Sequence, residues 1–321
     1  SGNDRIGGLV GTIEASGTVT GATTTATASG SQSIGGLVGQ SSGAVNNASA
    51  SGTVTATDQY AGGLIGDHQS SMPVTDVNAS GSVTGESSTG GLIGRIEANV
   101  INASAGGDVN GTSGNRVGGL IGAHRPNQAA KITNVSASGD VSASGNGVGG
   151  LVGHAKSSSG NPITVSNAHA SGAVNATGEK VGGLVGQFQN AGNVTDVSAK
   201  GDVNASGPGD GDRVGGLVGN LHHDSADYIL ANASATGDVD ATGQRVGGLI
   251  GYNQNGDRVE TSYARGDVST DGNYVGGLIG DTNDGSITDS YARGDVNSSG
   301  DYVGGLVGEA NGDVTRAYAS G

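Results

Sequence analysis

One pentapeptide, Gly-Gly-Leu-(Val/Ile)-Gly, occurs eleven times in this chain of 321 residues, and its copies cover the whole sequence. The copies begin at regular intervals, as at Gly35 and Gly62 or Gly118 and Gly149. A fixed period of about 30 residues indicates one structural unit stacked many times, each burying its apolar face against its neighbours. We therefore expect a single repeat domain over residues 1–321, without a separate catalytic domain.

Composition supports a thin, elongated core. The chain has 66 Gly but only 4 Pro, one Phe, no Trp and no Cys. The apolar residues are mainly Val, Ile, Ala and Leu at repeated places, which an ordinary globular domain of this length would not show. Few prolines argue against a collagen-like or disordered chain. The absence of Cys excludes disulfides and thiolate metal sites.

The charge balance excludes two classes of partner. The formal net charge is −15, so no general basic field exists for nucleic acid or an anionic membrane. No apolar run approaches the roughly 18 residues of a membrane span. We therefore expect neither nucleic-acid binding nor a membrane span.

The segment around a second glycine, which recurs in most repeats, predicts a strand. Small or apolar residues stand two before and two after this glycine, as Ala137 and Val141 do around Gly139, with polar residues between them. This alternation is typical of a β-strand with one dry face, and the glycine allows a bend at a corner. The glycines used for this alignment are Gly52, Gly81, Gly107, Gly139, Gly172, Gly201, Gly237, Gly266 and Gly294.

Two further columns do not fit simple alternation. An apolar residue seven before the aligned glycine, such as Ile132, has the wrong parity for a continuous strand, so a bulge or corner must intervene. In a strictly alternating strand, the pentapeptide leucines, such as Leu306, would point to the face opposite Val303 and Val307. Either a glycine-assisted bulge places them inside, which we favour, or one face carries an exposed leucine stripe.

These patterns predict an all-β fold, a β-solenoid (β-helix) of about eleven coils with three short strands per coil. A propeller is the poorer alternative, because its blades need about 40 residues. Helix is excluded by the glycine content and the lack of 3.6-residue periodicity. Eleven coils stacked about 4.8 Å apart would span roughly 50 Å.

The pentapeptide, followed by segments such as residues 285–296, resembles the GLUG repeat of bacterial and archaeal surface proteins. This resemblance implies an extracellular or cell-surface, adhesin-like product, and some relatives carry the repeats beside a secreted zinc peptidase. It does not imply peptidase activity, because His-Glu-Xaa-Xaa-His is absent from the sequence. The first unit departs from the pattern, because residues 18–29 are rich in threonine.

An acidic column one residue after the aligned glycine is the candidate metal site. Stacked carboxylates about 5 Å apart repel unless cations or basic neighbours intervene. Lys200, Arg265 and Arg293 could pair with some of them; Ca²⁺ is the alternative, and a solvated acidic edge is the simplest interpretation. The column consists of Asp108, Asp140, Asp202, Asp238, Asp267 and Asp295, interrupted by Ala173. The two Arg-Gly-Asp tripeptides that it includes, at Arg265 and Arg293, fall inside a predicted strand, so we do not expect integrin binding.

Ten Asn-Xaa-(Ser/Thr) sequons are candidates for glycosylation, and nine fall at predicted outward positions. They can equally arise from Asn and Ser ladders that stabilise a solenoid. The ten are Asn47, Asn78, Asn102, Asn110, Asn134, Asn175, Asn193, Asn204, Asn232 and Asn297.

Two sets of side chains could bind a ligand. Tyr263, Tyr291 and Tyr318 form an outward ladder that could stack on sugars or shield one end of the solenoid. Histidines gather after the pentapeptide, where we expect exposed loop residues; a metal site at His222, His223 and Asp227 is the alternative. The histidines are His68, His124, His154, His222 and His223.

No arrangement of a nucleophile with its base, phosphate loop or paired-carboxylate cleft can be assembled from these spacings, so we expect no enzyme. The leading hypothesis is a non-enzymatic extracellular structural protein forming a cell-surface fibre, stalk or filament. The last residues of the chain and its first residues occupy nearly successive positions of the repeat. This predicts either head-to-tail self-association or a segment taken from a longer protein. The alternatives are an adhesin module for cell adhesion, binding glycan or host protein through its loop edge, and a repeat region beside a secreted peptidase.

Overall fold

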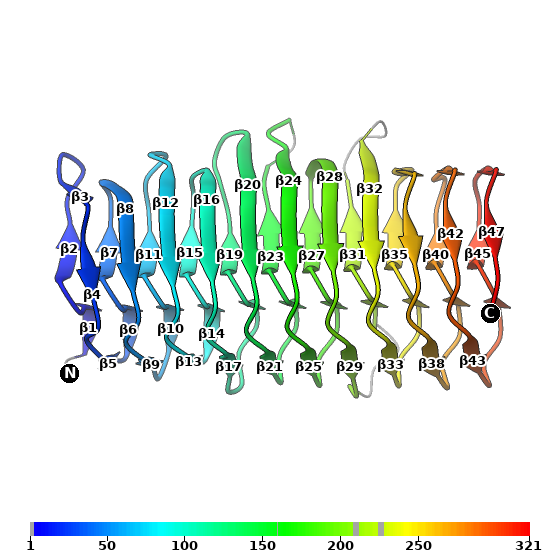
Figure 1. Ribbon diagram of the computed structural model, residues 1–321, viewed down its shortest axis with the longest axis horizontal. Helices are drawn as coiled ribbons and strands as arrows, with labels where there is room; N and C mark the ends of the chain where they lie inside the picture. The colour runs from blue at the N-terminus through cyan, green and yellow to red at the C-terminus, as the bar shows by residue number, and fades with distance from the viewer. Residues whose placement is uncertain (1–2, 159, 208–211, 224–227) are drawn as a thin grey trace.

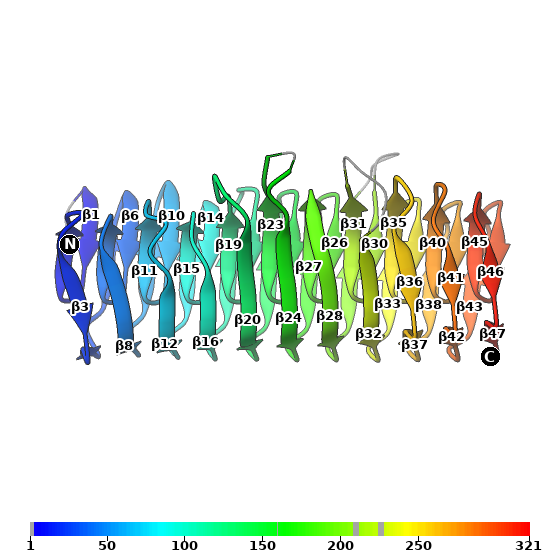
Figure 2. The same cartoon turned by 90° about the horizontal axis from the view of Figure 1, so that it is seen from above.

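The computed structural model describes residues 3–158, 160–207, 212–223 and 228–321. The chain winds into an elongated rod in which the coils follow one another from the N-terminal to the C-terminal end (Figures 1 and 2). In the described residues all regular structure is strand, and every strand pair is parallel and joins neighbouring coils, as β18 (Val117–Gly118) and β22 (Val148–Gly149) do. The predicted β-solenoid is confirmed.

Four sheets run along the rod, so most coils contain four strands and the predicted three is wrong. The difference arises at the pentapeptide, where the two glycines turn a corner and divide one expected strand between two sheets. Sheet A ends on the first glycine of each pair. Its strands are β1 (Asp4–Gly7), β6 (Gln32–Gly35), β10 (Gln59–Gly62), β14 (Ser87–Gly90), β18, β22, β26 (Val181–Gly182), β30 (Val214–Gly215), β34 (Val246–Gly247), β39 (Val275–Gly276) and β44 (Val303–Gly304).

Sheet B begins on the Val or Ile of the pentapeptide. Its strands are β2 (Val10–Ile13), β7 (Val38–Ser41), β11 (Ile65–His68), β15 (Ile93–Ile96), β19 (Ile121–His124), β23 (Val152–Lys156), β27 (Val185–Gln189), β31 (Val218–His222), β35 (Ile250–Gln254), β40 (Ile279–Thr282) and β45 (Val307–Ala310).

Sheet C holds the longest strands, and in the last coils each strand is split in two. Its strands are β3 (Thr18–Thr20), β4 (Thr23–Thr24), β8 (Ala44–Ala50), β12 (Val74–Ala79), β16 (Val100–Ala105), β20 (Ala130–Ala137), β24 (Ile163–Ala170), β28 (Ala191–Ala199), β32 (Ile229–Ala235), β36 (Arg258–Glu260), β37 (Tyr263–Ala264), β41 (Ile287–Thr288), β42 (Tyr291–Ala292), β46 (Val314–Thr315) and β47 (Tyr318–Ala319).

Sheet D follows the corner at the aligned glycine, which separates it from sheet C as predicted. Its strands are β5 (Ala28–Gly30), β9 (Val54–Ala56), β13 (Val83–Gly85), β17 (Val109–Gly111), β21 (Val141–Ala143), β25 (Val174–Ala176), β29 (Val203–Ala205), β33 (Val239–Ala241), β38 (Val268–Thr270) and β43 (Val296–Ser298).

Two sets of apolar contacts hold each coil together. Between sheets B and C, Leu151 and Val152 pack in the same core as Val165 and Ala168. Between sheets A and D, valines such as Val148 and Val174 form a second, narrower core. Small residues stand between the two cores: a Cβ built on Gly150 would lie 3.1 Å from the Cβ of Ala170. The pattern of small residues thus sets the two-core cross-section.

The leucines of the pentapeptide are buried in every coil except the first and the last, so the favoured prediction that they lie inside is confirmed and the exposed stripe is wrong. From Leu37 to Leu278 each is fully buried. The amides of Leu151 and Val152 both donate to the carbonyl of Leu184 in the next coil, at 2.9 Å each. This shared acceptor marks a tight corner, and a Cβ at Gly149 would lie 2.2 Å from the carbonyl oxygen of Val152. Only glycine allows the corner that turns the leucine inward.

The predicted break in parity within sheet C is a single residue with a left-handed backbone. It lies five residues before the aligned glycine in every coil from the second onward, and Asn or Asp occupies most of these positions, because their short polar side chains tolerate this conformation best. The residues are Asn47, Asp76, Asn102, Asn134, Asn167, Asp196, Asn232, Thr261, Asp289 and Arg316, with φ between 48° and 56°.

Candidate functional site

The left-handed column of sheet C forms a side-chain ladder along the rod. The Asn134 amide donates to Asn102 Oδ1 at 3.0 Å, and Asn167 donates to Asn134 Oδ1 at 2.8 Å. In the same way Asn102 donates to Asp76 Oδ1 at 2.9 Å. At the C-terminal end, Arg316 binds Asp289 through two bonds of 2.6 and 2.7 Å. These exposed bonds tie each coil to the next on the outside of the sheet.

All ten sequon asparagines are exposed. Four of them, Asn47, Asn102, Asn134 and Asn232, belong to the left-handed column, and Asn204 donates to Asn175 Oδ1 in a shorter ladder on sheet D. Exposure permits glycan attachment, and the ladders support the alternative structural interpretation of the same residues. Glycosylation stays a prediction.

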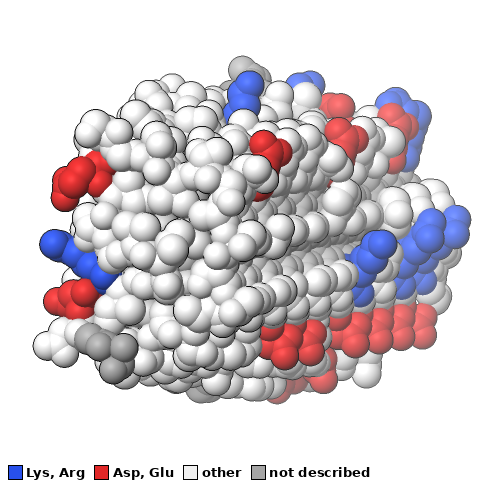
Figure 3. Space-filling view, turned by 60° about the vertical axis from the view of Figure 1, so that its left-hand side comes forward, with Lys and Arg blue, Asp and Glu red and all other residues white. Residues whose placement is uncertain are grey.

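The six aspartates of the acidic column lie exposed at the corner between sheets C and D. The side chains of Asp108 and Asp140 each accept a hydrogen bond from a backbone amide of the next coil. Asp108 Oδ1 accepts the amide of Asp140 at 3.0 Å, and Asp140 Oδ1 accepts the amide of Ala173 at 2.8 Å. From Asp202 to Asp295 the same bond recurs at 2.8–3.0 Å. In Figure 3 acidic side chains gather in a row on the face in view, beside a row of basic ones.

The acidic column therefore has a structural use, since every carboxylate except that of Asp295 accepts a corner amide of the next coil. Within the described ranges no group of three or more metal-binding side chains comes together. The Ca²⁺ site stays a prediction without a coordinating cluster to support it. The two Arg-Gly-Asp tripeptides lie across this corner, between β37 and β38 and between β42 and β43, rather than inside one strand as predicted.

The predicted pairing of basic residues with this column is wrong for the two arginines. Arg265 donates to the Tyr291 hydroxyl at 3.0 Å, and Arg293 donates to that of Tyr318 at 3.2 Å. Their guanidinium groups also lie over tyrosine rings of their own coils. No ion pair joins Lys200, Arg265 or Arg293 to an aspartate in the described part of the chain. The arginines stabilise the tyrosine ladder instead.

The predicted tyrosine ladder has parallel, closely stacked rings. The ring centroids of Tyr263 and Tyr291, and those of Tyr291 and Tyr318, are 5.1 Å apart. Both faces of Tyr291 are therefore covered by its neighbours, and a sugar would meet ring edges and hydroxyls rather than an open face. A second stack, Tyr274 on Tyr302 at 4.8 Å, was not predicted; both residues stand two before the Gly-Gly pair, as the sequence alignment could have shown.

The expected exposed histidine row is wrong for most of its members. His68, His124, His154 and His223 are buried. His124 pairs in register with Ile96 and Ala155, so it occupies an inward column of sheet B. The next member of that column is Phe188, which a column-by-column alignment would have revealed. His68, His124 and His154 lie in strands of sheet B and not in the loop, because each strand continues past the last glycine of the pentapeptide.

Two of the buried imidazoles donate hydrogen bonds to backbone carbonyls of loop residues. Nε2–H of His124 donates to the Ala98 carbonyl at 2.8 Å, and that of His68 donates to the Met72 carbonyl at 2.9 Å. Burial lowers the pKa of His68 and lowers that of His124 to about 4. Both rings are neutral at pH 7, and their role is structural.

The alternative metal site receives no support from the residues that can be described. His223 Nδ1 contacts Asp257 Oδ1, both groups being buried, and burial raises the pKa of Asp257. Asp227, the third proposed ligand, lies outside the described residues. The His223–Asp257 pair closes the loop edge beside Tyr228, whose ring centroid is 4.9 Å from that of His223.

A polar groove along the line between sheets A and B was not predicted. The residue two before the Gly-Gly pair on sheet A meets the residue directly after the pentapeptide on sheet B. Arg95 lies 4.7 Å from the ring centroid of Tyr60, and Arg245 donates to Asp281 at 2.8 Å. We call this line the A/B groove.

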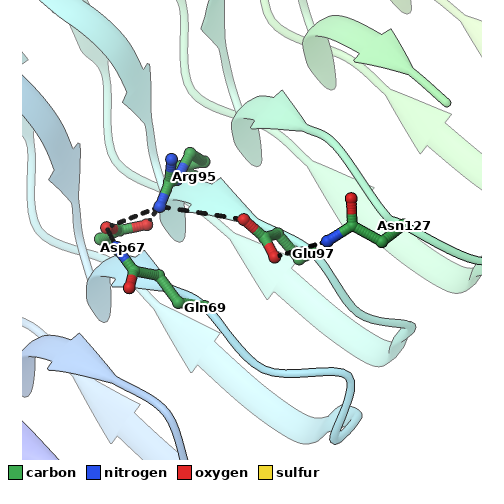
Figure 4. Close-up of polar contacts among 5 residues, drawn as sticks. All are labelled: Asp67, Gln69, Arg95, Glu97 and Asn127. Carbon is green, nitrogen blue, oxygen red and sulfur yellow. Dashed lines mark hydrogen bonds and ion pairs between the residues drawn. The ribbon is translucent and has the colours of Figure 1, made fainter. Parts of the chain in front are cut away.

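Charge in the A/B groove is compensated where acids and arginines alternate. Arg95 donates to both Asp67 oxygens, at 2.7 and 3.1 Å, and lies 3.9 Å from Glu97 (Figure 4). Gln69 donates to Asp67, and Asn127 from a later coil donates to Glu97. Asp67 is almost fully buried, and the bidentate bond from Arg95 satisfies both of its side-chain oxygens.

Comparison with known proteins agrees with this architecture. The model of the family described as "The GLUG motif" matches residues 30–55, 177–204, 242–269 and 271–297. The predicted resemblance is confirmed, because four stretches of this β-solenoid match the GLUG motif.

Halomucin from Haloquadratum walsbyi (strain DSM 16790 / HBSQ001) is 72% identical to this chain over 270 residues. That similarity covers 82% of the chain and 3% of the relative, so the chain spans only a small part of the curated protein's length. No solved structure matches the chain. In the described residues, no helix is long and apolar enough to cross a membrane. The motif and the relative together suggest a surface-associated repeat protein.

Proposed function

We propose that this chain is a stiff, non-enzymatic rod segment of an extracellular fibre or stalk at the cell surface. The observation that carries the proposal is the register of the sheets, which continues along the described rod with one shift in sheet C, between Ile163 and Val165. Residues at equivalent places in the repeat pair with one another coil after coil, as Val117, Val148 and Val181 do. Such a stack resists bending because each coil is bonded to the next through several ladders at once.

The surface supports a structural use. Its exposed columns repeat the same side chains, and their polar atoms bond to neighbouring coils, whereas an active site needs a singular set of residues. The similarity to a short part of Halomucin, a far longer protein, also fits a segment of an extended chain. A repeat region beside a secreted peptidase would serve the same spacing role.

The sheet edges of the first and last coils suit head-to-tail association. Leu9 at one end and Val303 and Val314 at the other are 45–55% exposed, beside unpaired strand edges. Such edges pair readily with another coil, whether of the same polypeptide or of a second copy. We include self-association through these edges in the proposal.

Electron microscopy and sedimentation of the purified 321-residue chain test both parts. We expect rods with a coil spacing of about 4.8 Å and an axial length near 50 Å or a multiple of it. Longer unbranched rods at high concentration would support head-to-tail association. Flexible or globular particles would contradict the rod, and short rods at every concentration would contradict only the self-association.

Adhesion is the second candidate, favoured by the exposed tyrosine hydroxyls of the ladder. Binding to a glycan array, lost on Tyr291→Ala and kept on Tyr302→Ala, would support it. We expect weak binding at most, because the stacked rings cover one another's faces. Failure on every array would leave the rod as the whole function.

A further inference from the structure

A pocket opens on the middle of the A/B groove. Most of its residues follow or end the strands β19 and β23, which Figure 1 labels. Its volume is about 440 Å³. The lining residues come from two successive coils and are mainly basic or polar. They are Arg116, Arg125, Pro126, Asn127, His154, Lys156, Ser157 and Ser158. Three cationic side chains, Arg116, Arg125 and Lys156, therefore share one concave surface.

The positive charge of this pocket lacks an acidic partner. Neither Arg116, Arg125 nor Lys156 forms an ion pair with any described residue. Elsewhere in the groove, Arg95 and Arg245 each bind an aspartate. Three cations that share one concave surface create a local positive field, which attracts anions although the net charge of the chain is −15.

The register explains why the acid is missing here. In the sheet B column that faces the groove, Asp67 and Asp281 supply carboxylates in other coils. At the pocket the same column holds Ala123 and then His154. Because these two residues carry no carboxylate, a bound anion could occupy this position and balance the positive charge.

Arg125 carries a hydrogen-bond donor that faces no acceptor of the described protein. Its side chain is half-buried, and its Nε–H is shielded from solvent without any hydrogen-bond acceptor. Burial and the nearby Arg116 lower the pKa of the Arg125 guanidinium. A buried donor on a charged group is unfavourable unless an acceptor reaches it.

We propose that Arg116, Arg125 and Lys156 bind an oxyanion, a sulfate, phosphate or carboxylate group of a small ligand. Arg125 presents a planar fork suited to two oxygens, and Lys156 stands at the exposed rim as a point charge. The side chains of Ser158 and Asn127 add polar groups to the rim of the pocket. The proposal is independent of the rod function, which needs no ligand.

Titration calorimetry of the 321-residue chain with sodium sulfate, phosphate or citrate, at low ionic strength, tests the site. We expect one site per chain and at least tenfold weaker binding for Arg125→Gln, because a charge-assisted bond is lost. Lys156→Gln at the rim should weaken binding a few-fold. Preference for sulfate and phosphate over citrate would assign a tetrahedral anion, and the reverse order a carboxylate.

Arg265→Gln is the matched control, because Arg265 is an exposed arginine outside the pocket. Equal weakening by Arg265→Gln and Arg125→Gln would show diffuse ion accumulation and overturn the proposal, as would the absence of binding by all three anions. If Arg125→Gln fails to fold, Lys156→Gln and Arg265→Gln still give the comparison.

His154 supplies a second readout. Burial first, and then Arg125, Arg116 and Lys156, lower its pKa to about 4, while its Nε2 contacts Gln189 Oε1 at 3.2 Å. An anion held among these cations cancels part of their field, so the NMR titration midpoint of His154 should rise on adding sulfate. An unchanged midpoint at saturating sulfate would place any bound anion elsewhere and contradict the assignment.

Discussion

At the scale of the residue, glycine sets how closely successive coils stack. A Cβ built on Gly107 would lie 2.2 Å from the carbonyl oxygen of Gly81 in the preceding coil. The backbone there is not left-handed, so the requirement is space rather than conformation. Equivalent glycines at the other corners meet the preceding coil in the same way, as Gly139 meets Gly107.

Two adjacent glycines allow a matched test of this requirement. Gly107→Ala should lower stability by at least about 2 kcal/mol, because the methyl group forces two coils apart. Gly106→Ala should be neutral or slightly stabilising, since its Cβ would meet only Ser138 Oγ at 3.8 Å and the unfolded chain loses freedom. Denaturant midpoints of both variants check this, and equal midpoints would contradict the steric argument.

Buried histidines make the rod sensitive to acid. The pKa of His124 falls from 6.5 to about 4 on folding, so the unfolded state binds more protons between these values. Stability is therefore full above pH 6.5 and is lost as the pH falls toward 4, by about 1.4 kcal/mol per pH unit for this residue.

Denaturant midpoints at pH 7.5 and pH 5 measure this loss. His124→Gln keeps an N–H donor for the Ala98 carbonyl but does not titrate, so the difference between the two midpoints should shrink. His169→Gln, at an exposed histidine, is the control. A difference that His124→Gln leaves unchanged would show that other groups cause the acid sensitivity.

At the scale of the element, the left-handed residue of sheet C joins two strand segments of opposite parity. It turns Ile132 and Val135 to the same core although they are three residues apart. Its side chain then continues the external ladder. The same position therefore serves the interior through its backbone and the surface through its amide.

Substitutions at Asn134 separate these two contributions. Asn134→Ala should cost about 1–3 kcal/mol, from left-handed strain and lost ladder bonds. Asn134→Gly should cost less, because glycine accepts this backbone and loses only the ladder. Asn110→Ala, at an exposed asparagine on sheet D without left-handed φ, is the control for thermal denaturation. An alanine variant as stable as the glycine variant would contradict the role of strain.

At the scale of the whole molecule, each coil contacts mainly its two neighbours, so the rod should tolerate the loss of one complete unit. Deleting residues 118–148 joins Val117 to Gly149 and restores the pentapeptide junction, since Val117 is equivalent in register to Val148, which normally precedes Gly149. We expect an intact β spectrum and a rod shorter by about 4.8 Å.

Deleting residues 118–132 instead removes half a coil and breaks the register of every sheet at once. Circular dichroism and small-angle X-ray scattering should then show loss of cooperative folding. If both deletions behave alike, the coils are not the cooperative units of this chain.

The sequence by itself determined the stacking, because the period, the Ala and Val columns and the glycine corners are local and repeat in every unit. It also placed the tyrosine ladder and the acidic column on the surface. The strand count and the two cores depended on how the Gly-Gly corner folds, which parity alone does not specify, whereas the burial of His124 could have been predicted from the apolar column that it shares with Ile96 and Phe188. The A/B groove and its unpaired arginines were decided only by tertiary structure, because they join residues from different sheets and different coils whose meeting no single repeat encodes.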